Sequence, residues 1–265
     1  MQKIKNIAFI GAGNVATQLG FALVGAGFKI VQVYSRTQTS AEWLAGKLSA
    51  DFTISIDEIK LDADLYIISL TDDATGEICK KLDLRDKFVV HTSGTLPLDI
   101  LSSISNRYGV FYPLQTFSKC RNINFQDIPL CLEANSQENL DLLKKLAKKV
   151  SEKIYEINSG QRKMLHLAAV FACNFPNFMY TIAQKILGDA DLEFDLLKPL
   201  IRETAEKVQT INPVDAQTGP AIRGDRKIME QHLELLKDNK ELYDLYKFIS
   251  DQLVTSNKQP ENEQL

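Results

Sequence analysis

Short apolar runs alternate with amphipathic segments along the first 158 residues. The runs are continuous and rich in β-branched and aromatic residues, which is typical of parallel strands buried on both faces. The segments between them place apolar residues at helical spacing. The strands predicted in this way are 4–10, 28–34, 63–70, 86–94, 108–114, 128–134 and 153–158. The helices predicted between them are 14–26, 40–49 and 136–151.

The pattern changes at about residue 159, where strand-like runs stop. A break at 211–224 holds two prolines and two glycines, which interrupt helices. Pro176 lies inside an apolar helical segment and is expected to kink it. The helices predicted in this half are 160–188, 192–210, 225–237 and 240–254.

Together the two patterns predict an α/β fold with a doubly wound N-terminal sheet, followed by an all-α C-terminal domain. The predicted boundaries are 1–158 for the first domain, 159–254 for the helical domain and 255–265 for a flexible polar tail.

Composition narrows the class of protein. The 265 residues carry 31 Lys and Arg against 34 Asp and Glu, a net charge of −3, so no basic surface indicates a nucleic-acid partner. No apolar run approaches the ~20 residues that span a bilayer, and the first residues lack the features of a signal peptide. Four cysteines without a CxxC pair, and three histidines, argue against a metal site and favour a reducing cytoplasm. We therefore expect a cytoplasmic protein that binds small molecules, without a membrane partner.

A glycine-rich loop follows the first predicted strand and opens the first predicted helix. It matches the G-x-G-x-x-G/A fingerprint of a Rossmann dinucleotide-binding domain, with the residues Gly11, Ala12, Gly13, Asn14, Val15 and Ala16. Gly11 permits the tight turn, Gly13 lets the pyrophosphate approach bare backbone, and Ala16 keeps helix and strand close. The helix N-terminus offers free N–H groups to phosphate. The alternative is a structural turn in a fold without a cofactor.

The end of the second predicted strand indicates which dinucleotide binds. NAD sites place an acidic residue there to hold the ribose hydroxyls, but this strand ends in Ser35-Arg36-Thr37, and the first acidic residue of the chain is Glu42. A guanidinium flanked by hydroxyls suits a 2′-phosphate, because it pairs with phosphate bidentately. We therefore expect NADP. Alternatively, Arg36 is a solvated loop residue.

Two further strand ends supply candidates, since open α/β sheets bind ligands beyond the carboxyl ends of their strands. Leu70 and Thr71 are expected near the adenosine. His91, Ser93 and Gly94 are expected nearer the nicotinamide, where they could hydrogen-bond a carboxamide or a substrate carboxylate. Alternatively, they cap the helix that follows.

Candidate catalytic residues lie at the start of the helical half. In a regular helix His166, Cys173 and Asn177 share a face with Val170, and Asn174 is adjacent to it. Hydride transfer to a carbonyl or imine needs a proton donor, which His166 could be, while Asn174 and Asn177 orient the substrate. Alternatively, these side chains satisfy neighbouring backbone. Arg223 could bind a substrate carboxylate, or pair with a nearby acid or cap a helix.

Four segments carry a family resemblance across nearly the whole chain: 91–101, 112–118, 166–177 and 217–225. They resemble a family of Rossmann-like NADP oxidoreductases that has a C-terminal helical domain of unknown function. This family lies within the 6-phosphogluconate dehydrogenase-like group, which includes the pyrroline-5-carboxylate reductases. The resemblance implies a homodimer formed through the helical domain.

The resemblance also sets a limit on the chemistry. Hydroxyacid dehydrogenases of the group carry a catalytic Lys three residues before an Asn, whereas this chain has Phe171 before Asn174. Pyrroline-5-carboxylate reductases use hydroxyl residues in a later segment, where this chain has Thr218. The expected function is hydride transfer between NADP(H) and a small carboxylate-bearing carbonyl, hydroxyl or imine substrate. The alternative is a non-catalytic NADP-binding sensor or scaffold.

Overall fold

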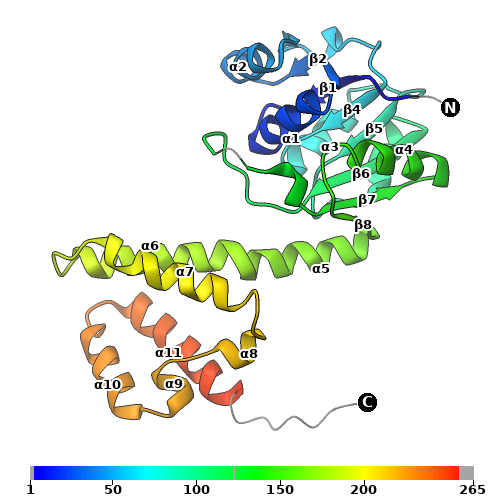
Figure 1. The fold of residues 1–265 in the computed structure, drawn as a ribbon. Coiled ribbons are helices and arrows are strands. Elements are labelled where there is room, and N and C mark those ends of the chain that lie inside the picture. Colours follow the sequence, from blue (N-terminus) through cyan, green and yellow to red (C-terminus); the bar gives the residue numbers. More distant parts are fainter. Residues whose placement is uncertain (1–2, 122, 257–265) are drawn as a thin grey trace, which may run out of the picture. The chain divides into compact units, whose positions relative to one another are not determined.

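Eight strands form one sheet in the computed structural model, which describes residues 3–121 and 123–256. The order across the sheet is β3-β2-β1-β4-β5-β6-β7-β8, with a switch point between β1 and β4 (Figure 1). A ligand site is therefore expected beyond the carboxyl ends of β1 and β4. The bounds are β1 Asn6–Ile10, β2 Lys29–Tyr34, β3 Asp51–Thr53, β4 Leu65–Ile68, β5 Phe88–His91, β6 Arg107–Pro113, β7 Leu130–Ala134 and β8 Ile154–Glu156.

The sheet is parallel from β3 to β6, but β7 runs antiparallel to β6. This corrects the expectation that all the apolar runs are parallel strands. Parallel pairing needs a crossover, usually a helix, and among residues 114–121 and 123–129, which the structure describes, the single turn Phe125–Asp127 is the only helical element. The next connection includes α4 (Gln137–Ala147), and β8 is accordingly parallel to β7.

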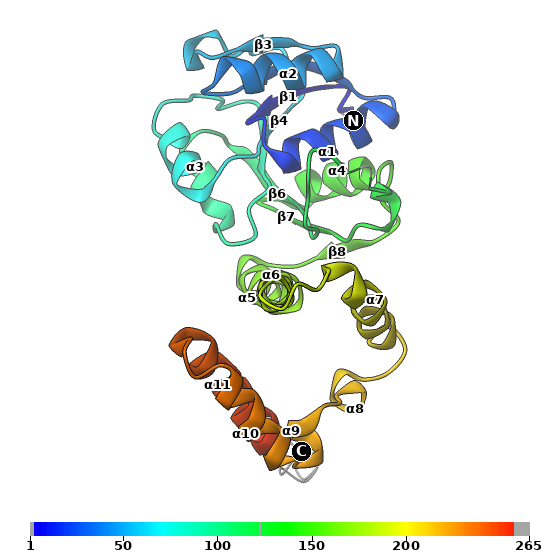
Figure 2. The ribbon, with the colours of Figure 1, turned by 90° about the vertical axis from the view of Figure 1, so that its left-hand side faces the viewer.

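Helices cover both faces of the sheet, as the doubly wound prediction requires. Successive residues of β1 alternate between two cores, with Ile7 and Phe9 in one and Ala8 and Ile10 in the other. The helices α1 (Asn14–Gly25), α2 (Gln38–Leu48) and α4 pack on the first core. Helix α3 (Asp72–Cys79) packs on the second (Figure 2).

Most predicted elements are confirmed, with ends shifted by a few residues. Strand β3 was missed because it has three residues and two of them are exposed, so its sequence carries no apolar run. The predicted helical half is confirmed as helical.

Helix α5 (Ser159–Ala169) and helix α6 (Phe175–Gly188) are joined by a π-helical turn, Val170–Asn174. Pro176 follows this turn at once. Proline lacks an N–H and crowds the preceding turn, and a π turn is a common way to accommodate such a disruption. One residue is added to the turn, so residues beyond it are rotated by about 100° relative to α5.

The chain divides into two compact units at residues 180 and 181. Residues 159–180 thus belong to the same compact unit as the sheet. The predicted domain boundary at residue 158 stays a prediction. The second unit contains the remainder of α6 and the helices α7 Lys198–Lys207, α8 Pro213–Ala216, α9 Pro220–Arg223, α10 Arg226–Leu235 and α11 Lys240–Ser256. Residues 255 and 256 of the predicted tail end α11, and the rest of that tail lies outside the described residues.

Candidate active site

The glycine loop lies at the switch point of the sheet. Gly11 has φ +122°, and a Cβ there would lie 2.1 Å from the carbonyl oxygen of Ser69, so only glycine fits this turn. The Gly11 N–H donates to the Tyr34 carbonyl at the end of β2 (2.8 Å). Ala16 is fully buried in the core between α1 and the sheet.

The same loop fits a dinucleotide pyrophosphate. A Cβ at Gly13 would meet no atom within 4 Å, so the backbone is open to a ligand. Gly13 is also the N-cap of α1, without a side chain that satisfies the first N–H groups, and the first turn has no acidic residue. Unpaired N–H groups and the helix dipole both favour an anion at this position.

Arg36 lies beside this loop on a separate pocket. Tyr34, Leu70 and Thr71 line a cavity of about 470 Å³ together with Arg36. Within the described residues Arg36 forms no salt bridge with an acidic side chain. The structure therefore brings together the predicted adenosine-side residues, with Ser35 and Thr37 flanking the guanidinium in sequence.

The turn after β5 is held by a polar cluster in which Ser93 binds the backbone that follows, as one of the two alternatives expected, and in which Asp72, which the sequence did not indicate, also takes part. The Ser93 hydroxyl donates to Asp72 (2.8 Å) and accepts from the N–H groups of Thr95 and Leu96 (both 3.0 Å). The Thr95 hydroxyl also donates to Asp72. Because the Ser93 hydroxyl is fully engaged, it shapes the turn, and its predicted contact with a cofactor stays a prediction.

His91 lies inside the protein at the end of β5. It is 1% exposed, its Nδ1 accepts from the Ser93 N–H (3.1 Å), and its Nε2 has no partner among the described residues. Burial, together with the nearby Arg162 guanidinium, lowers the pKa of His91 from 6.5 to about 4. His91 is therefore neutral at pH 7, and its predicted cofactor contact stays a prediction.

His166, on α5, reaches the turn after β5. Its Nδ1 lies 3.2 Å from the Tyr112 hydroxyl on β6. A Cβ at Gly94 would lie 2.6 Å from that Nδ1 and 3.0 Å from Cζ of Tyr112, so both rings press against the bare backbone of Gly94. Two predicted site residues, His166 and Gly94, are thus in contact. Tyr112, which the sequence did not single out, contacts both of them.

A pocket of about 320 Å³ opens beside this pair. Gln115, Thr116, Cys173 and Asn174 line it together with His166 and Tyr112. Asn174 therefore shares a pocket with His166, as expected, although it is exposed. Asn177, beyond the π turn, is exposed and is not among the lining residues. The predicted roles of both asparagines stay predictions.

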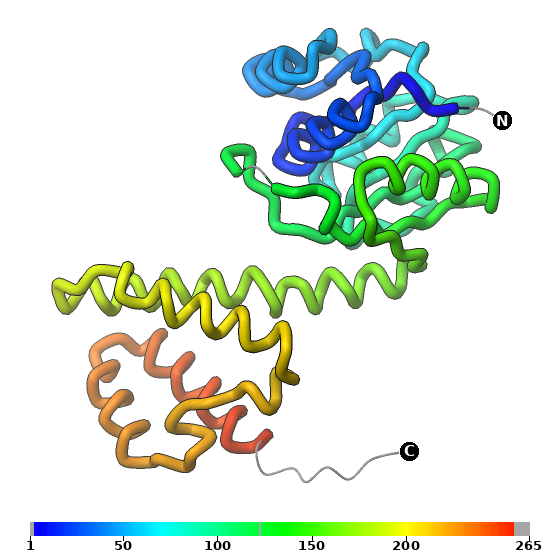
Figure 3. Tube along the Cα trace, viewed as in Figure 1, coloured from blue at the N-terminus to red at the C-terminus, as the bar shows by residue number. Residues whose placement is uncertain are grey.

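The loop between β6 and β7 links the two parts of the site. The Asn14 amide donates to the Phe117 carbonyl (2.9 Å), and the Gln18 amide donates to the carbonyls of Ser118 and Arg121 (2.8 and 2.9 Å). Figure 3 shows this loop beside α1. The predicted cofactor residue Asn14 thus has its amide turned to a neighbouring loop.

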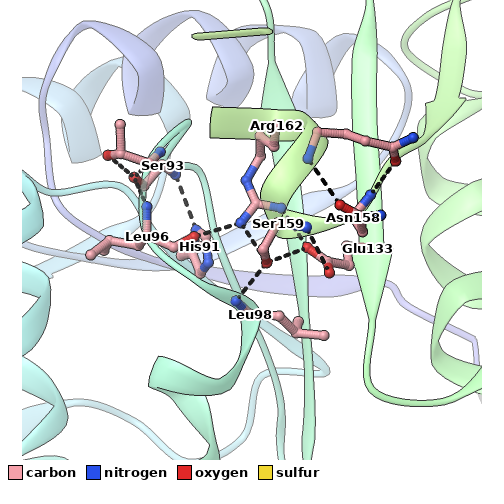
Figure 4. Close-up of polar contacts among 10 residues, drawn as sticks. His91, Ser93, Leu96, Leu98, Glu133, Asn158, Ser159 and Arg162 are labelled. Carbon is pink, nitrogen blue, oxygen red and sulfur yellow. Dashed lines mark hydrogen bonds and ion pairs between the residues drawn. The ribbon is translucent and has the colours of Figure 1, made fainter. Parts of the chain in front are cut away.

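Arg162, one turn before His166, is the largest fully buried side chain of the described residues. It pairs with Glu133 on β7 (2.5 Å) and donates to the Leu96 carbonyl (2.5 Å) and the Ser159 hydroxyl (3.2 Å), as Figure 4 shows. No sequence signal indicated this, because a lone Arg in a helix is usually exposed.

Thr218 and Arg223 belong to the second unit and are exposed. Gly219 (φ +120°) and Gly224 (φ +69°) bound the short helix α9, which ends at Arg223. The predicted substrate contacts of both residues stay predictions.

Comparison with known proteins gives the family. A family model described as NADP oxidoreductase coenzyme F420-dependent matches residues 6–94, and a domain of unknown function (DUF2520) matches residues 128–253. A candidate NADP oxidoreductase from Bacteroides fragilis is 45% identical, with 95% of this chain and 98% of that chain covered and a TM-score of 0.91. This chain belongs to the same family of NADP oxidoreductases. The resemblance predicted from the sequence is thereby confirmed, together with NADP as the cofactor of the family.

More distant structures share the fold of this NADP oxidoreductase. A protein from Thermotoga maritima is 25% identical, with 96% of this chain and 100% of that chain covered and a TM-score of 0.79. A 1-pyrroline-5-carboxylate reductase from Streptococcus pyogenes is 15% identical, with 94% and 98% covered and a TM-score of 0.64. No curated protein matches the chain. Within the described residues no helix has the length and apolar character needed to cross a membrane.

Proposed function

We propose that this cytoplasmic oxidoreductase transfers hydride between NADP(H) and a small carbonyl, hydroxyl or imine substrate that bears a carboxylate. The observation that carries the proposal is the pairing of His166 with Tyr112 against Gly94, at the end of a strand in a dinucleotide-binding sheet. A proton donor at this place is what reduction of a carbonyl or imine requires. Four unpaired cysteines suit a reducing compartment.

The cofactor would be held by backbone and one cation. The pyrophosphate suits the open backbone from Gly11 to Ala16, and the 2′-phosphate suits Arg36 beside Ser35 and Thr37. Leu70 and Thr71 line the adenosine-side pocket. When bound, NADPH supplies the hydride.

The protein's own part is to hold and move a proton. Burial raises the pKa of the Tyr112 hydroxyl, which therefore stays protonated at neutral pH and can donate to His166 Nδ1. This bond leaves the proton of a neutral His166 on Nε2. As that proton passes from Nε2 to the substrate oxygen or nitrogen, the Tyr112 hydroxyl proton moves to Nδ1, so His166 stays neutral and the Tyr112 oxygen carries the negative charge until solvent reprotonates it. Asn174 lines the same pocket and would orient the substrate, while Asn177, Thr218 and Arg223 are candidates for further substrate contacts.

A homodimer formed through the helical region is part of the proposal. One face of α5 and the start of α6 carries large apolar side chains that are exposed: Met164, Leu167, Phe171, Phe175 and Phe178. A contiguous apolar face of this kind is typical of an interaction surface.

The cofactor is tested by calorimetric titration of the purified protein with NADPH and NADH. We expect NADPH to bind more tightly, and Arg36→Ala to weaken NADPH by about 10- to 100-fold, the value of charge-assisted hydrogen bonds to a phosphate, with little effect on NADH. Arg85→Ala is the control, because Arg85 is exposed and precedes the amino end of β5, whereas the glycine loop follows the carboxyl end of β1 in the same parallel part of the sheet. Equal loss for both dinucleotides would contradict the assignment of Arg36.

Turnover is tested by following NADPH oxidation with a panel of keto acids, aldehydes and imines. We expect His166→Ala to lower kcat by about 100-fold or more and Tyr112→Phe to lower it less, with NADPH binding retained. Turnover that survives His166→Ala would show that another group supplies the proton. Tight NADPH binding without turnover of any substrate would instead favour a non-catalytic sensor or scaffold.

A further inference from the structure

Helix α5, which carries His166, contacts the sheet through polar side chains on two successive turns. On the first of these turns Arg162 forms a polar cluster, and one turn later His166 contacts Tyr112 and Gly94. Residues four apart lie on one helix face, with about 5–6 Å between their Cβ atoms. Arg162 and His166 therefore point to the same face of the sheet from successive turns.

The strand register shows what this face contains. His91 on β5 pairs with Val110 on β6, and Val110 pairs with Glu133 on β7. Residues paired across neighbouring strands point to the same face, and so does a residue two positions further along a strand. Glu133 and Tyr112 are thus the two points on one face of the sheet to which α5 is attached.

Arg162 joins three segments through its guanidinium. It contacts Glu133 on β7, the Leu96 carbonyl in the turn after β5, and Ser159 on its own helix. Glu133 in turn accepts from the N–H and the hydroxyl of Ser159 (3.0 and 2.8 Å), and the Ser159 hydroxyl accepts from the Leu98 N–H (3.0 Å), as drawn in Figure 4. The first turn of α5 and the turn that contains Gly94 are therefore tied to the same charged group.

The ion pair of Arg162 and Glu133 is not the arrangement that would contribute most to the free energy of folding. Replacing a buried ion pair by apolar residues is often neutral or stabilising. The two buried side-chain nitrogens that lack a hydrogen-bond partner among the described residues, Arg162 Nε and His91 Nε2, both lie in this region. A planar, five-donor group that reaches a carboxylate and a carbonyl from different segments instead fixes geometry.

We propose that Arg162 is the positioning residue of the active site, which holds His166 and the Gly94 turn in register through Glu133 and the Leu96 carbonyl. The proposal rests on the proposed function for its catalytic consequence, but the position of the His166 ring can be measured without turnover. Lysine cannot replace arginine in this role, because its single ammonium lacks the planar fork.

The test measures His166 directly by NMR of protein labelled with ¹⁵N in its histidines. The chain has three histidines, so His166→Gln assigns the signals. We expect the wild-type ring to show Nδ1 as an acceptor and the proton on Nε2, and Tyr112→Phe to abolish that signature. Arg162→Met/Glu133→Gln removes the ion pair without leaving a lone buried charge and retains an acceptor for the Ser159 N–H. It is expected to fold and to give a mixture of tautomers, as in a solvated imidazole.

Two further variants complete the test. Arg162→Lys is expected to retain the wild-type His166 signature only in part. Lys163→Met is the matched control and should retain it fully, since Lys163 is the exposed neighbour on the same helix. With a substrate in hand, Arg162→Lys should lower kcat by at least tenfold while NADPH binding changes by less than twofold. A folded double variant with an unchanged His166 signature would overturn the proposal. If the double variant loses the His166 signature but the wild-type protein turns over no substrate, the result would support the positioning role of Arg162 and contradict only the proposed function.

Discussion

At the scale of single residues, the buried His91 beside the buried Arg162 makes the free energy of unfolding depend on pH. His91 carries no charge in the folded protein because burial and Arg162 lower its pKa from 6.5 to about 4. In the unfolded chain it takes up a proton below about pH 6.5. The unfolded state therefore binds more protons between these values, and stability falls as the pH falls.

We expect the free energy of unfolding to decrease from pH 6.5 down to about pH 4, by up to roughly 3 kcal/mol from His91. Urea unfolding at a series of pH values measures it. His91→Gln should flatten this part of the curve, whereas His232→Gln, which affects a ring bonded to Tyr246 on the second unit, should not. An unchanged slope in His91→Gln would show that other groups cause the acid sensitivity.

At the scale of an element, the turn between β1 and α1 uses two glycines for different reasons. Gly11 has a positive φ and sits against the Ser69 carbonyl, whereas Gly13 has φ −81° and open space at its Cβ position. The fold requires the first glycine, whereas the open space at the second leaves its backbone accessible to the pyrophosphate in our proposal.

The two glycines can be separated by matched substitutions. Gly11→Ala is expected to destabilise the protein by at least about 2 kcal/mol, from backbone strain and the clash with Ser69. Gly13→Ala should change stability by no more than about 1 kcal/mol but weaken NADPH binding strongly. Thermal unfolding and calorimetric titration on both variants check this. A stable Gly13→Ala protein with wild-type NADPH affinity would argue against pyrophosphate binding at this loop.

At the scale of the whole molecule, the apolar face of α5 and α6 predicts association. Phe171 is 63% exposed and stacks edge-on against Phe175. Burial of several aromatic side chains is the usual source of dimer stability.

We expect sedimentation to give about twice the 29.8 kDa chain mass for the wild-type protein and the chain mass for Phe171→Glu/Phe178→Glu. Phe52→Glu is the control, because Phe52 is an exposed aromatic residue on edge strand β3. A wild-type monomer, or a dimer that survives the double variant, would place the interface elsewhere.

Sequence patterns were sufficient where the signal is local. The glycine loop, the strand ends and the change to helices at residue 159 depend on neighbours in the chain, and the structure reproduces them. The three-residue strand β3 and the reversal at β7 carried no such signal, since one is too short for an apolar run and the other depends on connection length.

By itself the sequence determined the dinucleotide-binding fold and the preference for NADP, because spacing of glycines and the absence of an acid at residues 34–37 act through local backbone and one side chain. Only the tertiary structure decided the partners of His166. Tyr112 lies 54 positions away and Glu133 lies 29 positions from Arg162. Such pairs form through strand register and helix packing, which no single segment encodes. Asn177, which a regular helix would place on the face of His166, follows the π turn and is not among the residues that line the His166 pocket.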